Sequence, residues 1–140
     1  MSNPPRVVND TNVWLSALYF AGNEAKIVHQ IEENNITSVI SEFILQELKE
    51  KMVVKFETPT YAANATVSYI TSISEIVTLK GKDFRLRDPD DNKVLETAAV
   101  GKCNFLITGD KDLLTLKKYQ QIQIVTPAQF LYKNPKNLVA

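Results

Sequence analysis

Arg6-Val-Val-Asn-Asp10 decides how the chain is expected to fold, because a short β-branched strand runs there directly into an acidic residue. Four similar segments follow, at residues 37–40, 75–79, 104–108 and 122–125. Helical spacing of apolar residues is found between them, over residues 25–33, 44–52 (after Ser41 as N-cap), 60–72 and 91–100. A closing helix is expected from Pro127 to Leu131, capped by Thr126.

Strands that alternate with helices predict βαβ units and a parallel sheet, so we expect a single three-layer α/β/α domain. The domain is expected over residues 1–132, with residues 133–140 as a C-terminal tail. The composition, 44% hydrophobic and 23% charged, is typical of a soluble globular protein. No apolar run approaches the ~20 residues of a membrane span, and the N-terminus does not resemble a signal peptide. A cytoplasmic protein without membrane contact is therefore expected.

The aspartates are unevenly distributed along a chain whose formal net charge is zero. Six of the seven fall into three short groups: Asp10, then Asp88, Asp90 and Asp91, then Asp110 and Asp112. Asp10 follows the first strand directly, and Asp110 follows the fourth by two residues. Parallel sheets bind ligands at the carboxyl ends of their strands. These two acids are therefore candidates for a functional site.

Two further acids lie on or beside apolar helix faces. Glu47 stands at the edge of the stripe that contains Leu48, and Asp91 shares its face with Val94 and Leu95. A carboxylate on a buried face is unfavourable unless its charge is compensated. A divalent ion such as Mg²⁺ or Mn²⁺ prefers carboxylate oxygens and would provide that compensation. Without the ion, at least one of these acids should have a raised pKa.

Four motifs, in order, resemble those of the PIN-domain family: Val8-Asn-Asp-Thr-Asn-Val13, Ser41 through Glu47-Leu48, Asp88-Pro-Asp-Asp-Asn-Lys-Val-Leu95 and Thr108-Gly-Asp-Lys-Asp-Leu113. The last has the form typical of the toxin (VapC-like) subfamily, and the similarity runs from about residue 7 to residue 131. The resemblance implies a five-stranded parallel sheet of order 3-2-1-4-5. In that order strands one and four are neighbours, so Asp10 and Asp110 would face each other.

The resemblance also implies metal-dependent cleavage of single-stranded RNA. The acids that carry over as catalytic are Asp10, Glu47, Asp91 and Asp110, and the expected ligands of Mg²⁺ or Mn²⁺ are Asp10, Asp91, Asp110 and Asp112. Asn12 and Thr108 match polar positions that support the first and last aspartates. Glu47 is expected to help bind the ion or to orient the attacking water. A toxin role, a small antitoxin partner and a homodimer are further expectations from the family.

Basic residues flank the acidic groups, and Arg85, Arg87 and Lys111 are expected to meet RNA phosphates. With a net charge of zero, such binding should be modest and sensitive to salt.

Simpler interpretations exist for single residues. Asp10 and Asp110 could each cap a helix, and Glu47 could pair with Lys51 at the surface. Chance capping explains the joint set of acids less well. A phosphatase of the haloacid-dehalogenase type needs a second aspartate where this chain has Asn12, and a receiver domain needs an aspartate at the end of the third strand. A non-catalytic RNA- or protein-binding domain of the same fold is the main alternative.

Overall fold

The structure is a computed structural model, and it describes residues 3–133. The strands are β1 (Arg6–Asn9), β2 (Thr37–Ser41), β3 (Ser74–Val77), β4 (Phe105–Ile107), β5 (Lys118–Tyr119) and β6 (Ile122–Val125). The helices are α1 (Thr11–Tyr19), α2 (Asn23–Glu32), α3 (Glu42–Val54), α4 (Thr60–Ser72), α5 (Pro89–Val100), α6 (Lys111–Leu116) and α7 (Pro127–Lys133). Of the expected tail, only residue 133 is described, and it belongs to α7; residues 134–140 lie outside the described part.

One sheet of order β3-β2-β1-β4-β6-β5 forms the centre of the molecule. The five expected strands are present, parallel and in the expected order, and β1 lies between β2 and β4. The expectation of five strands was wrong by one, because β5 adds a sixth that runs antiparallel to β6. A strand of two residues is too short to show a periodic pattern in the sequence.

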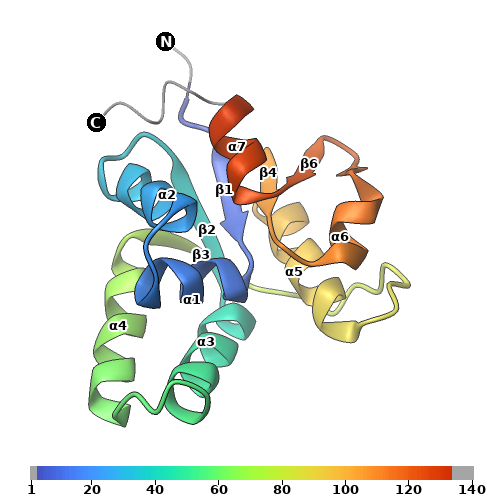
Figure 1. Cartoon of the computed structure of the whole chain (residues 1–140). Helices are drawn as coiled ribbons and strands as arrows, with labels where there is room; N and C mark the ends of the chain where they lie inside the picture. The colour runs from blue at the N-terminus through green and yellow to red at the C-terminus, as the bar shows by residue number, and fades with distance from the viewer. Residues whose placement is uncertain (1–2, 134–140) are drawn as a thin grey trace.

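Helices cover both faces of this sheet (Figure 1). α1 packs on α2, and α2 packs on α7, which in turn contacts β4 and β6. α5 crosses β1, β2 and β4, and Figure 1 shows it behind the sheet when α2 and α7 are in front. The α/β/α layers expected from the sequence are therefore confirmed.

The core explains why these segments take up these positions. β1 and β4 contribute fully buried valine, leucine and isoleucine side chains, and α3 and α5 bury the apolar stripes seen in the sequence. β1 and β4 bury successive residues, whose side chains point to opposite faces, because helices cover both faces of the sheet there. Within the described residues no helix is long and apolar enough to cross a membrane.

Candidate active site

Asp10 and Asp110 lie at the same edge of the sheet. β1 and β4 pair in parallel with Asn9 opposite Ile107, and the Asp10 N–H continues the ladder by donating to the Ile107 carbonyl at 2.9 Å. Each acid then begins a helix: Asp10 is the N-cap of α1, and Asp110 is the N-cap of α6, where its Oδ2 accepts from the Leu113 N–H at 2.9 Å. The capping interpretation is thus correct for both residues. Capping also holds the two carboxylates at the same edge of the sheet.

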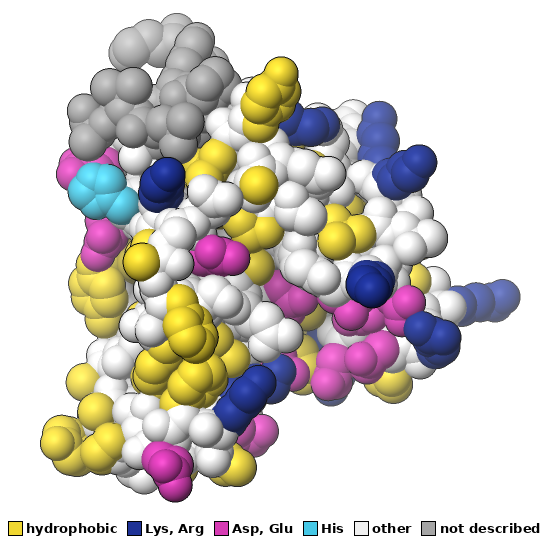
Figure 2. All heavy atoms as spheres, viewed as in Figure 1, with side chains coloured by type: hydrophobic (Ala, Val, Ile, Leu, Met, Phe, Trp, Pro, Cys, Tyr) yellow, Lys and Arg dark blue, Asp and Glu magenta, His cyan; other side chains and the backbone are white. Residues whose placement is uncertain are grey.

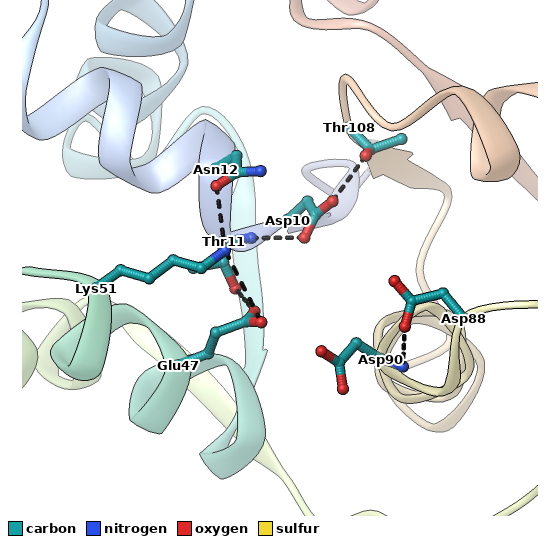
Figure 3. A network of polar contacts seen from close by, with 8 residues as sticks. All are labelled: Asp10, Thr11, Asn12, Glu47, Lys51, Asp88, Asp90 and Thr108. Atoms are coloured by element: carbon teal, nitrogen blue, oxygen red, sulfur yellow. Dashed lines mark hydrogen bonds and ion pairs between the residues drawn. The ribbon is translucent and has the colours of Figure 1, made fainter. Parts of the chain in front are cut away.

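Thr108 connects these two aspartates. Its hydroxyl donates to Asp10 Oδ2 at 2.8 Å and accepts from the Asp110 N–H at 2.9 Å, and the residue is fully buried. The other Asp10 oxygen, Oδ1, accepts from the Thr11 N–H at 2.7 Å. Figure 3 shows the Asp10 carboxylate held between Thr108 and Thr11. The supporting role expected of Thr108 therefore has a structural basis for both acids.

Asp91 is turned inward at the start of α5. Asp88 is the N-cap of this helix and accepts from the Asp90 N–H at 2.9 Å, which leaves Asp91 on the buried face with only 7% of its surface exposed. Among residues 3–133, Asp91 Oδ2 has no hydrogen-bond partner. Asp91, Asp110 and Asp112 can each offer a carboxylate oxygen such that the three atoms lie within 4.8 Å of one another.

Burial and like charges raise the pKa of two of these acids. The pKa of Asp91 rises to about 7, first because the carboxyl is desolvated, and then because Asp110 lies against it. The pKa of Asp10 is also raised, mainly by burial, although the hydrogen bond from Thr108 acts in the opposite direction. The negative charges of Glu47 and Asp110 add to the effect on Asp10. The raised pKa expected for such a cluster is therefore present.

Glu47 reaches the site from α3 and does not point away into solvent. Its carboxylate accepts a hydrogen bond from the Thr11 hydroxyl, and Lys51 Nζ lies 3.9 Å from its other oxygen (Figure 3). Sequence reasoning missed Thr11, which contacts both Asp10 and Glu47. Its signal was weak: a threonine directly after the first aspartate, at the first position of a helix.

Asn12 does not make the contact that its position suggested. Its side chain is exposed on α1, and its Oδ1 accepts from Lys51 Nζ at 3.4 Å instead of approaching Asp10. The turn of the helix places Asn12 on the solvent side, while Thr11 stays buried beside Asp10.

An open pocket of about 570 Å³ lies next to the acids, and it is lined by Asn12, Arg87, Gly109, Asp110, Lys111 and Asp112. Acidic side chains gather beside Lys and Arg side chains on this part of the surface (Figure 2). Arg87 forms an ion pair with Asp112, in which Nη2 lies 2.9 Å from Oδ1 and 2.8 Å from Oδ2. Lys111 lines the pocket. Arg85 is exposed on the loop between β3 and α5 and is not among the residues that line the pocket.

Three residues outside this cluster have ordinary structural roles. Trp14 is in the core with 1% of its surface exposed, and Cys103 is buried. His29 is exposed on α2, with Nε2 3.5 Å from Glu33.

The sequence is similar to those of known proteins. A family described as PIN domain matches residues 6–112. An uncharacterized protein of Methanocaldococcus jannaschii is 34% identical, over 90% of this chain and 89% of the relative. The matched residues include every acid of the site described above. The chain therefore belongs to the PIN-domain family, whose members are generally metal-dependent nucleases.

Proposed function

We propose that this protein is a metal-dependent ribonuclease that hydrolyses phosphodiester bonds of single-stranded RNA. The observation that supports this most strongly is Asp91, a buried carboxylate beside two other aspartates, whose Oδ2 has no hydrogen-bond partner in the described part of the chain. A buried charge of this kind is unfavourable unless a positive group compensates it. The need for a cation at this position distinguishes the cluster from a set of ordinary helix caps.

The residues present fit a hard divalent ion such as Mg²⁺ or Mn²⁺, because the atoms that Asp91, Asp110 and Asp112 offer are carboxylate oxygens. Asp91 and Asp110 would hold the ion together with Asp10, which lies at the adjacent strand end, and Asp112 stands beside them. An ion held there supplies a Lewis acid for a phosphate oxygen and lowers the pKa of a bound water.

The chain itself keeps these acids in position. Thr108 and the Thr11 N–H fix both oxygens of Asp10, and the first turn of α6 fixes Asp110. We propose that Glu47, whose carboxylate accepts a hydrogen bond from the Thr11 hydroxyl, accepts a proton from an attacking water or orients it. Fixed geometry of this kind favours in-line attack on phosphorus without a covalent intermediate on the protein.

The basic side chains around the pocket provide the contacts for RNA. Lys111 lines the pocket, and Arg85 and Arg87 lie on the loop before α5. These charges would bind phosphates and carry no base preference, so we expect weak affinity that falls as salt increases.

The test is cleavage of a labelled single-stranded RNA with Mg²⁺ or Mn²⁺ and with EDTA. We expect metal-dependent cleavage that Glu47→Gln reduces by about 10²-fold or more, a size usual for the loss of a general base. Asp10→Asn removes a proposed metal ligand and should also reduce cleavage strongly. Glu50→Gln is the matched control, since Glu50 is exposed on the same helix and bonds only Gln46 among described residues. Full metal-dependent activity in Asp10→Asn would contradict the proposal. RNA binding without cleavage would instead assign a non-catalytic binding domain.

We further propose that the protein is the toxin of a toxin–antitoxin pair, acts in the cytoplasm as a homodimer, and is inhibited by a small antitoxin. The support for this role is the likeness of the Thr108-Gly-Asp-Lys-Asp-Leu113 motif to that of the toxin subfamily. If it is correct, expression of the wild-type chain should stop cell growth while Asp10→Asn does not, and light scattering should give twice the mass of one chain.

A further inference from the structure

Arg87 is positioned to act on the metal site as well as on RNA. Its guanidinium donates to both oxygens of Asp112, at 2.9 and 2.8 Å, although 84% of the arginine side chain is exposed. Both contacts come from one guanidinium nitrogen, Nη2, so the two oxygens of Asp112 share a charge-assisted interaction with Arg87.

The partner is one of the three aspartates of the cluster. Asp112 can offer an oxygen within 4.8 Å of oxygens from Asp91 and Asp110, and the negative charge of Asp110 also acts on Arg87. Asp91 and Asp110 have no arginine or lysine ion pair among residues 3–133. The three aspartates therefore differ in how their charges are compensated. Asp112 has an ion pair with Arg87, whereas Asp91 and Asp110 have none among the described residues.

We propose that Arg87 is an internal cation that competes with the divalent ion for Asp112 and so weakens metal binding. This inference rests on the proposed metal site. A guanidinium and a metal ion need the same carboxylate lone pairs, and a positive charge beside the site repels a second one. Asp91 and Asp110, with Asp10, then hold the ion, while Asp112 contributes fully only when Arg87 is displaced. Arg87 is thus a positioning residue that sets the metal affinity of the site.

The test is a titration of the full chain with Mn²⁺, in which the electron paramagnetic resonance signal measures the Mn²⁺ that remains free. Exposed ion pairs and repulsions near water are of modest size, so we expect Arg87→Gln to tighten Mn²⁺ binding about threefold to tenfold. Arg85→Gln is the matched control: it removes the same charge from the same loop, but Arg85 has no ion pair with Asp112. Its Mn²⁺ affinity should stay within about twofold of wild type.

A double-mutant cycle locates the effect at Asp112. Asp112→Asn should weaken Mn²⁺ binding little in the wild-type background, and should remove the whole gain in the Arg87→Gln background. Unchanged or weaker binding in Arg87→Gln, or an equal gain in Arg85→Gln, overturns the inference while leaving the metal site intact. If neither wild type nor Arg87→Gln binds Mn²⁺, the proposed metal site fails, and this inference fails with it.

Discussion

Replacing Asp91 by asparagine should make the protein more stable when divalent ions are absent, although it removes a proposed metal ligand. The side chain keeps its shape, loses its charge, and gains an N–H group that can donate to the neighbouring Asp110. Repulsion among the acids would then be relieved. An ordinary buried residue behaves in the opposite way, since its replacement usually destabilises a protein.

The size of the effect follows from the pKa. A rise from the ordinary value of 3.8 to about 7 favours the protonated carboxyl by about 4 kcal/mol, since a tenfold change in acidity is worth about 1.4 kcal/mol. This figure is an upper bound for the gain. We expect about 2 kcal/mol, because the asparagine amide must also be desolvated and meets few partners.

The sign depends on pH. A carboxyl whose pKa is raised by folding contributes stability below about pH 4, and this contribution is lost as the pH rises through about 7. The raised pKa of Asp10 acts in the same direction. In EDTA, the wild-type protein should therefore be less stable at pH 8 than at pH 5, and Asp91→Asn should reduce this difference.

The assay is unfolding by urea in the presence of EDTA at pH 5 and pH 8, with circular dichroism as the measure of the folded fraction. At pH 8, Asp91→Asn should unfold at higher urea than wild type, and added Mn²⁺ should stabilise only the wild type. Asp90→Asn is the control, because Asp90 is the exposed residue next to Asp91 in the chain. Its negative charge interacts favourably with the N-terminal end of the helix dipole of α5. Asp90→Asn should lose a few tenths of a kcal/mol. Lower stability of Asp91→Asn than of wild type at pH 8 would refute the reasoning.

Three further substitutions test other parts of the structure by the same unfolding assay. Thr108→Val removes the hydroxyl bonded to Asp10 and should destabilise by about 2–3 kcal/mol; a loss below about 0.5 kcal/mol would contradict that contact. Glu96→Gln, at a buried residue that accepts two backbone N–H groups, should destabilise by about 2 kcal/mol, and no change would show that its charge is unimportant. Gly101→Ala would place a Cβ 2.5 Å from Val39 Cγ1 and should destabilise by about 1–3 kcal/mol, whereas a stabilised variant would disprove the close packing.

The strand ends and the inward face of α5 could be predicted because both are local features. Asp10 follows the first strand directly and Asp110 comes shortly after the fourth, and helical spacing alone turns Asp91 toward Val94 and Leu95. The adjacency of β1 and β4 needed the family resemblance, because strand order is not encoded in any one segment.

What could not be predicted depends on contacts between distant segments. Thr11 matters because α3 brings Glu47 against it, from 36 positions away in the chain. The pair between Arg87 and Asp112 joins a loop to α6 across 25 positions. The sequence suggested only that Arg87 lies near acids, and it could not say which of them it would bind.

The proposed function requires that the carboxylates of Asp10, Asp91 and Asp110 together hold a divalent ion. A crystal of the protein soaked in Mn²⁺ tests it directly through anomalous diffraction. We predict a manganese peak within ligand distance of Asp91 and Asp110, on the side that faces Asp10. A well-ordered site without such a peak, at a Mn²⁺ concentration that supports RNA cleavage, would contradict the claim.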